Sequence, residues 1–441
     1  MRRAIFGVLV LSIGLLLNSC NTTEPPPPPP NGEKPTLELS LEDVSCIEAW
    51  IKLTTTNLQL PATITLKQIN PTGDTLSQIL NLNTQDSLLY IDSLLPNQNY
   101  QYQASSIENP ATSNELSVTT MDTTSHDFTF ETFTFGGTAG SSTLYDVAII
   151  NENYIIAVGT VFLTDSLGQP DPQPYGVAIW DGQSWELKKI FHNTNIPVTP
   201  RGIFVISPNE IYLAAGSIFR WDGVSSTVQM VFSRLSLPDP NATIEKLWGS
   251  SSSSIYGVGN VGSIVYYNGI NWQRIESGTE VNINDVFGVI NQKNDNKQIF
   301  CATSFVLQLG DHKILTIDQN NNVDSLHWDT GRRVNSTWSK NGWIVYTSGG
   351  GVFNNKSGRW KEEISIPLYY TNRIRGNGLN DIFAVGDFAL LAHFNGADWR
   401  IYQDLLQLPL TSFNSITVKE NIISIVGYSG EKALVIIGNR N

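Results

Sequence analysis

The sequence has few of the residues that redox and metal sites use. It contains three cysteines in 441 residues, and we expect no disulfide framework from Cys46 and Cys301 in a chain of this length. None of its five histidines lies two or four residues from another, so no metal site is indicated. We therefore expect no metal ion and no cofactor.

Positive charge is also scarce, with 27 Lys and Arg against 40 Asp and Glu and a formal net charge of −13. Such a chain lacks the basic surface of a nucleic-acid-binding protein, and it is not expected to dock unaided on anionic lipid. Glycine-rich phosphate motifs precede a helix, and the sequence shows no helical periodicity. The predicted fold class is therefore all-β.

The N-terminus has the pattern of an export signal. Arg2 and Arg3 precede an apolar run that is shorter than the roughly 20 residues of a membrane-spanning helix. The run ends in "LNSC", which resembles a bacterial lipobox with Leu17 three positions before Cys20. The resemblance implies cleavage of residues 1–19 and a diacylglycerol on the sulfur of Cys20. The alternative is a plain secretory signal with an incidental cysteine.

Residues 20–35 follow as a linker with six consecutive prolines from Pro25, which favour an extended polyproline II spacer. Together with the acylated cysteine, this linker predicts a protein of the bacterial cell envelope, anchored by lipid at the outer membrane or the cell surface.

Residues 36–121 contain short alternating runs separated by Asn, Asp, Gly and Pro turns, which is typical of a β-sandwich. Within "LLPNQNYQY", Leu94, Pro96 and Tyr100 resemble the tyrosine corner of fibronectin type III domains. The resemblance implies that the tyrosine hydroxyl bonds back to the chain. Alternation places Trp50 on the face opposite Ala49, Ile51 and Leu53, which departs from the usual packing of that family.

Residues 127–441 contain a repeat of about 45 residues. Its copies are recognised by an apolar strand ending in glycine or threonine: "YIIAVGT", "IYLAAGS", "IYGVGN", "IFCATS", "WIVYTSG", "IFAVGD" and "IISIVGY". A further apolar run precedes each copy, and in several copies an Asp-Gly or Asn-Gly turn followed by tryptophan comes after it. Four strands per repeat without a helix predict a seven-bladed β-propeller.

The two ends of this region predict how the ring closes. The last copy stops after a third strand, and residues 127–135 form an extra strand before the first copy. We expect the N-terminal strand to complete the last blade, because an open sheet edge invites aggregation. The repeat resembles the propellers of bacterial envelope lipoproteins with photosystem-assembly or BNR (Asp-box) repeats.

Candidate ligand-binding residues come from equivalent positions of the inner strands. Two residues before the first apolar position stand Tyr145, Arg201, Glu245, Asn284, Asn335, Asn372 and Asn414. One residue beyond the first apolar position of each inner strand, the larger side chains include Trp248, Trp338 and Arg375. Amides and aromatic rings of this kind suit sugar hydroxyls or a peptide. The alternative is that the amides cap turns and the rings pack between blades.

We expect a non-catalytic monomer whose propeller binds a protein or a glycan. A glycoside hydrolase or lyase is the alternative, with Glu245, Asp146 and Asp285 as carboxylates at the propeller mouth. A sialidase is disfavoured, because only Arg201 and Arg375 recur at inner-strand positions. A scaffold for envelope assembly is a third possibility.

Overall fold

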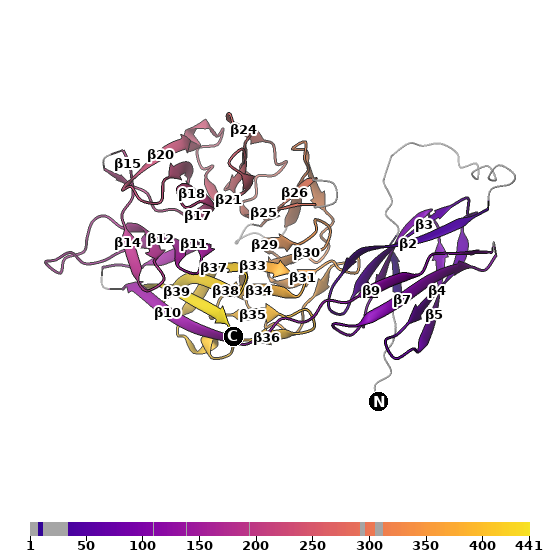
Figure 1. Cartoon of the computed structure of the whole chain (residues 1–441). Helices are drawn as coiled ribbons and strands as arrows, with labels where there is room; N and C mark the ends of the chain where they lie inside the picture. Colours follow the sequence, from indigo (N-terminus) through magenta and orange to yellow (C-terminus); the bar gives the residue numbers. More distant parts are fainter. Residues whose placement is uncertain are drawn as a thin grey trace. The chain divides into compact units, whose positions relative to one another are not determined.

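The computed structural model describes residues 8–11, 34–108, 110–137, 139–193, 195–291, 296–304 and 312–441. The predicted lipidation site Cys20, most of the linker and most of the signal peptide lie outside these residues. Two compact units are found: Met1–Thr124 with Asn395–Asp398, and Ser125–Phe394 with Trp399–Asn441. Both units consist of strands (Figure 1). In the described part of the chain, no helix is long and apolar enough to cross a bilayer.

The first unit is a fibronectin type III-like β-sandwich of two antiparallel sheets. One sheet has the order β1-β6-β3-β2, and the other has the order β5-β4-β7-β8 with β9 also paired to β7. The strands are β1 (Val8–Leu11), β2 (Thr36–Val44), β3 (Ala49–Thr56), β4 (Ala62–Ile69), β5 (Thr75–Leu82), β6 (Asp86–Ile91), β7 (Asn99–Ser106), β8 (Ala111–Thr112) and β9 (Leu116–Thr119). β1 belongs to the predicted signal peptide, and β5 is a strand that the sequence pattern does not predict.

The tyrosine corner is present in this sandwich. The backbone N–H of Leu95 donates to the hydroxyl of Tyr100 over 2.8 Å. Ala49, Ile51 and Leu53 are buried in the core between the sheets, as their alternation predicts. Trp50 lies on the other face of β3, where its ring is 5.7 Å from that of Tyr90 on β6. Trp50 is nevertheless fully buried.

The second unit is a seven-bladed propeller of four-stranded antiparallel blades, and the second blade carries two additional short strands. Blade one contains β11 (Thr143–Asn151), β12 (Tyr154–Val161), β13 (Tyr175–Trp180) and β14 (Trp185–Lys188), and blade two contains β17 (Gly202–Ser207), β18 (Glu210–Ala215), β19 (Ser217–Trp221) and β20 (Thr227–Phe232) with β15 (Phe191–His192) and β16 (Ile196–Pro197). Blade three contains β21 (Ile244–Ser251), β22 (Ser254–Gly259), β23 (Ile264–Tyr267) and β24 (Trp272–Ile275).

The remaining blades follow the same order. Blade four contains β25 (Ile283–Ile290), β26 (Lys297–Thr303), β27 (Lys313–Ile317) and β28 (Val323–Leu326), and blade five contains β29 (Val334–Ser339), β30 (Val345–Gly349), β31 (Gly351–Asn354) and β32 (Lys361–Glu362). Blade six contains β33 (Thr371–Gly378), β34 (Asp381–Gly386), β35 (Leu391–Phe394) and β36 (Trp399–Ile401). Blade seven contains β37 (Thr411–Lys419), β38 (Ile422–Ser429) and β39 (Lys432–Arg440).

The N-terminal strand closes the ring, as the sequence predicts. β10 (Phe128–Gly136) is the outer strand of blade seven and pairs antiparallel with β39, from Phe128 opposite Arg440 to Gly136 opposite Lys432. Figure 1 shows the magenta β10 beside the yellow β39. This pairing joins the first and last strands of the propeller, so the edge of the last sheet is covered.

The turns between the third and fourth strands explain the Asp-Gly and Asn-Gly pairs. In blade one, Oδ1 of Asp181 accepts from the backbone N–H groups of Gln183 and Ser184, and Gly182 has a φ of 95°. Asn268 accepts from the backbone of its turn in the same way, and Gly269 has a φ of 91°. Glycine is favoured at these positions because other residues are strained at positive φ.

Candidate functional site

The predicted ring residues lie at a recurring irregularity of the inner strands. In six blades one residue of the inner strand is left out of the pairing with the second strand, which is the geometry of a β-bulge. Those six residues are Tyr145, Glu245, Asn284, Asn335, Asn372 and Asn414. In blade two, Arg201 directly precedes β17. We call these seven residues the bulge ring.

Three amides of the bulge ring connect neighbouring blades. The Nδ2 group of Asn335 donates to the backbone oxygen of Asn372 over 2.8 Å, and that of Asn372 donates to the oxygen of Phe413 over 2.9 Å. Asn414 donates to the oxygen of Leu144 over 2.8 Å, which links blade seven to blade one. The fourth amide, Asn284, donates to Ser304 of its own blade. Their role in ligand binding stays a prediction.

Tyr145, Arg201 and Glu245 form a small cluster across the first three blades. The guanidinium of Arg201 lies 5.0 Å from the ring centre of Tyr145, and its Nε atom is 3.7 Å from a carboxylate oxygen of Glu245. Arg201 and Glu245 also line a cavity of about 390 Å³ that includes Phe219 and Met230. Arg201 is the exposed member, because 58% of its side chain is accessible.

The next residue of each inner strand forms a second ring, which we call the charged layer. Its ionisable members are Asp146, Lys246, Asp285 and Arg373, together with Arg375 two residues further along β33. Arg373 donates from Nη2 to Asp146 over 3.1 Å, from Nη1 to Asp285, and from Nε to the hydroxyl of Ser415 over 3.1 Å. One arginine of blade six thus joins carboxylates from blades one and four.

Lys246 and Arg375 complete this network. The Nζ atom of Lys246 lies 3.2 Å from Asp146 and donates to the backbone oxygens of Tyr145 and Arg201. Burial lowers the pKa of Lys246 to about 8, although Asp146 opposes that change. Arg375 donates to both oxygens of Asp285, over 2.9 and 2.7 Å. The charged groups are therefore saturated mainly by one another.

The carboxylates of this layer are held ionised. Burial alone raises the pKa of Asp146, but the charges of Lys246 and Arg373 and the hydrogen bond from Ser415 lower it well below its usual range. The pKa of Asp285 is also lowered, because Arg373 and Arg375 outweigh the effect of burial. A glycosidase needs one carboxyl group with a raised pKa as general acid, and neither aspartate meets that requirement.

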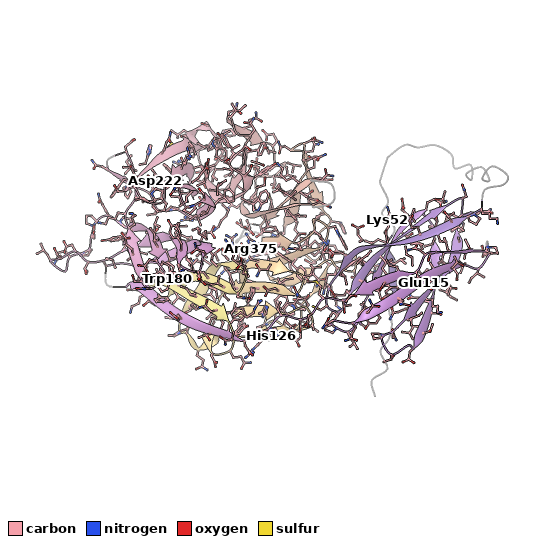
Figure 2. All side chains as sticks on the ribbon, in the orientation of Figure 1. Lys52, Glu115, His126, Trp180, Asp222 and Arg375 are labelled. Atoms are coloured by element: carbon pink, nitrogen blue, oxygen red, sulfur yellow. The ribbon has the colours of Figure 1, made fainter. Side chains whose placement is uncertain are left out.

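A cavity of about 300 Å³ borders the charged layer on the side toward which the inner strands run. Its lining includes Trp248, Phe287 and Arg375, and none of the bulge-ring residues contributes to it. Arg375 stacks over the ring of Phe287 at 5.2 Å. Figure 2 places Arg375 near the middle of the propeller, whereas Trp180 and Asp222 lie further out. The structure thus brings two predicted residues, Trp248 and Arg375, into one cavity.

Packing between blades explains the aromatic residues at this level. A Cβ atom on Gly288 of blade four would lie 2.5 Å from the indole of Trp248, so the glycine makes room for that ring. Gly249 makes room for Phe204 of the preceding blade in the same way. Trp338 is only 2% exposed, and it does not line the cavity. Trp248 therefore packs on the next blade and also faces the cavity.

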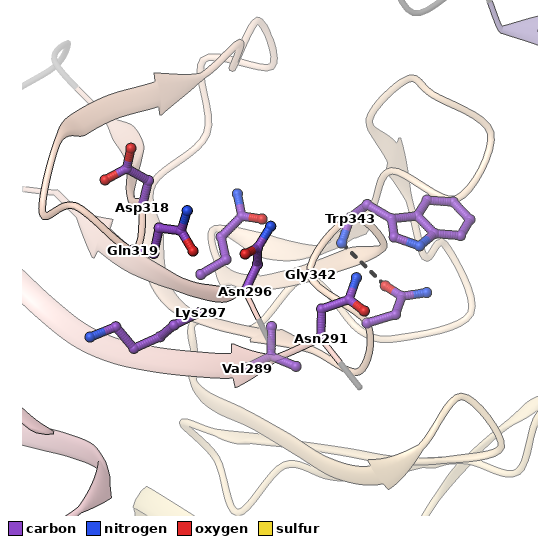
Figure 3. A pocket seen from close by; sticks show the side chains of 10 residues that line it. Val289, Asn291, Asn296, Lys297, Asp318, Gln319, Gly342 and Trp343 are labelled. Atoms are coloured by element: carbon purple, nitrogen blue, oxygen red, sulfur yellow. Dashed lines mark hydrogen bonds between the residues drawn. The ribbon is translucent and has the colours of Figure 1, made fainter. Parts of the chain in front are cut away.

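A polar pocket of about 380 Å³ lies among the hairpins of blades four and five, and its lining includes Gln298, Asp318, Gln319 and Trp343 (Figure 3). The indole of Trp343 points away from the amide groups that line the pocket (Figure 3). Oδ1 of Asn341 accepts from the backbone N–H of Trp343. Asp318 accepts hydrogen bonds from the backbone N–H groups of Asn320 and Asn322 in its turn.

Within the described residues, no group of three or more His, Cys, Asp and Glu could hold a metal ion.

Lys246 and Arg373 are the site residues that sequence reasoning missed. Both stand one residue after a predicted ring residue, at the repeat position that also holds Asp146 and Asp285. Charged residues of both signs at one inward-facing position of a repeat were the available signal. Which basic side chain pairs with which carboxylate depends on how the blades close into a ring, and the sequence repeat does not determine it.

Comparison with known proteins supports the propeller fold. No protein-family model and no curated protein matches the chain. Among solved structures, YCF48 bound to D1 peptide is similar, with a TM-score of 0.50 and 15% identity over 71% of this chain and 95% of that chain. The tricorn protease is also similar, with a TM-score of 0.40 and 8% identity over 86% of this chain and 44% of that chain. At 15% identity the likeness to YCF48 concerns the fold alone.

Proposed function

We propose that this chain is an exported lipoprotein, anchored through Cys20, whose propeller binds a polypeptide segment without catalysis. The central cavity is the binding site in this proposal, with Trp248, Phe287 and Arg375 as contacts. The observation that supports this proposal best is that the floor of the cavity is formed by charged groups that are already paired with each other. Such a floor orients a ligand but offers no carboxyl group for proton transfer.

The chemistry of the cavity fits a side chain of a peptide better than a catalytic substrate. Apolar walls from several blades surround it, and Trp248 and Phe287 supply flat apolar surfaces. The charged layer contains two carboxylates and three basic side chains, so its net charge is positive. A positive surplus favours a ligand group that carries negative charge or accepts hydrogen bonds.

The similar propeller of YCF48 was solved with D1 peptide bound. That complex supports polypeptide binding as the function to test first, and it supplies no contact residues for this chain. A glycan is the competing ligand, because aromatic rings also stack on sugars. Both ligand classes are therefore included in the same experiment.

Binding can be measured with the full chain against two defined panels, a phage-displayed peptide library and a glycan array. We expect selected peptides whose affinity falls about tenfold or more in Trp248→Ala, because truncating a central aromatic contact commonly costs that much. Trp343→Ala is the matched control, since Trp343 is a half-buried tryptophan outside the cavity. Glycan hits that are lost in Trp248→Ala, without peptide binding, would reject the polypeptide ligand.

The lipid anchor needs its own measurement. Metabolic labelling with a fatty acid should mark the wild-type chain and leave Cys20→Ser unlabelled and released from the membrane fraction, because the thioether to the lipid forms only on that sulfur. Equal labelling of the two proteins would reject the anchor and leave the ligand proposal untouched. The two parts of the proposed function are thus tested separately.

A further inference from the structure

The turn between β34 and β35 in blade six has an unusual sequence for its geometry. The N–H of Leu390 donates to the oxygen of Asp387 over 3.2 Å, and the two central residues, Phe388 and Ala389, have φ angles of 59° and 55°. Positive φ at both central residues defines a type I′ turn, which strongly prefers Asn and Gly there. Phe388 thus occupies a backbone conformation that is unfavourable for its side chain.

The equivalent turn of blade three shows the more common solution. There the N–H of Ser263 donates to the oxygen of Asn260, and glycine fills the second central position as Gly262, which has a φ of 60°. The first central residue is non-glycine in both turns, since Val261 has a φ of 53°, and blade six differs in having Ala389 where blade three has glycine. This second non-glycine residue adds backbone strain to the turn of blade six, and such strain is concentrated at functional sites.

Phe388 is also exposed, and other large apolar side chains lie around it. The ring of Phe388 is 67% exposed and its centre is 5.0 Å from that of Tyr369. Leu410 is 83% exposed, and its neighbour Thr411 accepts a hydrogen bond from the backbone N–H of Ala389. Leu368, next to Tyr369, is 63% exposed. We call these four residues, Leu368, Tyr369, Phe388 and Leu410, the blade-six patch.

Leu410 repeats the signature of Phe388, because it is exposed and has a φ of 49°. Two exposed apolar side chains of one patch are thus both held at positive φ. Neither exposure nor this backbone conformation stabilises the folded chain. We propose that the blade-six patch is a docking surface for a polypeptide segment that presents a large apolar side chain next to basic residues.

Charge and polarity select this occupant. Segments 363–370, 387–390 and 402–410, which carry the patch, contain Glu363, Asp387 and Asp404 and neither lysine nor arginine, although Arg333 of blade five lies close enough to act on Tyr370 together with Asp387. Together with the net charge of −13, these acids oppose an anionic lipid surface and attract a basic flank. Sugars need several hydrogen-bonding groups, whereas the tyrosine hydroxyl is the one polar side-chain group among the four residues.

The patch is separate from the central cavity. The patch lies on two kinds of loop, those that precede the inner strands and those that join the second and third strands. The cavity, in contrast, is lined by inner-strand residues that follow the bulge. The inference therefore goes beyond the proposed function and does not depend on it. Trp248→Ala should leave binding at the patch unchanged.

The test uses the full chain as wild type, Phe388→Asn and Leu410→Asn, with Leu167→Asn as matched control. Leu167 is 83% exposed, as Leu410 is, and lies in a distant loop of blade one. Phage-displayed peptides are selected on the wild type and resynthesised. We expect sequences with Phe, Trp, Leu or Ile beside Lys or Arg, and a loss of affinity of about tenfold or more in Phe388→Asn and Leu410→Asn only.

Thermal unfolding distinguishes docking from a structural role. Because asparagine tolerates positive φ, the melting midpoint of Phe388→Asn should be equal to or above that of the wild type. A clear fall in the midpoint would show that Phe388 stabilises the fold, and the proposal would be wrong. The proposal is also overturned if no selected peptide loses affinity in Phe388→Asn and Leu410→Asn; peptides that bind all four proteins equally and lose affinity in Trp248→Ala belong to the central cavity.

Two further outcomes point to other occupants and would replace the proposal. Sedimentation with vesicles of phosphatidylcholine and phosphatidylglycerol that is lost in Phe388→Asn would indicate a membrane contact. Concentration-dependent self-association lost in the same variant, measured by sedimentation velocity, would indicate a second copy of this chain. With the polypeptide occupant, the wild type does neither.

Discussion

The bulge ring of the propeller consists mostly of neutral amides, whereas the charged layer, one residue later in each inner strand, contains ionised side chains. The two rings hold the blades together differently. Asn335, Asn372 and Asn414 each donate to a backbone oxygen of the following blade. The charged layer instead connects blades that are not neighbours, because Arg373 of blade six reaches Asp146 and Asp285 of blades one and four. The amides of the bulge ring link neighbouring blades at three junctions, whereas the charged layer spans the channel.

This difference determines how each ring responds to a substitution. Removing an amide leaves one carbonyl without its donor, so the cost is confined to one junction between blades. Removing Arg373 from the layer takes one of two basic partners from each aspartate, since Lys246 still pairs with Asp146 and Arg375 with Asp285, and it disturbs three blades at once. The predictions below separate the two cases, beginning with the largest effect.

Replacing Arg373 should destabilise the propeller most. Its side chain is 5% exposed, and Arg373→Met leaves Asp146 and Asp285 without their shared partner. Breaking a buried ion pair by removing one partner costs about 3–5 kcal/mol in the free energy of unfolding, and we expect a loss at the lower end of that range because Lys246 and Arg375 still pair with the two aspartates. Urea denaturation of the full chain measures this loss.

Arg220→Met is the matched control, because Arg220 pairs with Glu210 over 3.6 Å but its side chain is 49% exposed. A surface pair of this kind contributes about 0–1 kcal/mol. Equal losses in the two variants would contradict the role given to the charged layer.

Acid should weaken the charged layer before the amide ring. The folded-state pKa values of Asp146 and Asp285 are lowered, so their contribution is present above the unfolded value of about 4 and is lost as the pH falls below it. The amides do not titrate. Urea midpoints at a series of acidic pH values should therefore fall more steeply for the wild type than for Asp146→Asn, which has one titrating carboxylate fewer in the layer, and parallel curves would count against this assignment.

Asn414→Ala should have a smaller effect, because it removes one bond between blades seven and one. A buried acceptor left without its donor costs about 1–3 kcal/mol. Gln183→Ala serves as control, since Gln183 is an exposed side chain in a hairpin turn of blade one. Hydrogen exchange should increase mainly in β11 and β37, and protection equal to that of the wild type there would refute the linking role.

Much of the fold could be predicted from local pattern. Alternation predicts the sandwich around Ala49, Ile51 and Leu53, and the tyrosine corner at Tyr100 forms as its motif indicates. The missing fourth strand of the last repeat predicts the pairing of β10 with β39. β5 escaped prediction because its pattern is weak: Leu76 and Ile79 are exposed, and Leu80 and Leu82 are buried.

The candidate site could be predicted only in part. The repeat identified the positions of Trp248 and Arg375, and both line the central cavity. It grouped them with the bulge ring, although those residues lie on the other side of the charged layer and three of their amides are used between blades. Spacing along the chain shows which residues are equivalent, but it does not show which of two successive residues meets a cavity.

The sequence by itself determined the number of repeats, the strands of most blades and the closure of the ring, because these depend on alternation and turns within a few residues. Only the tertiary structure decided the ionic partners. Arg373 meets Asp285 and Asp146 across 88 and 227 residues of sequence. Those contacts exist only when the seven blades close around one channel, since electrostatic attraction follows distance in space and burial strengthens it.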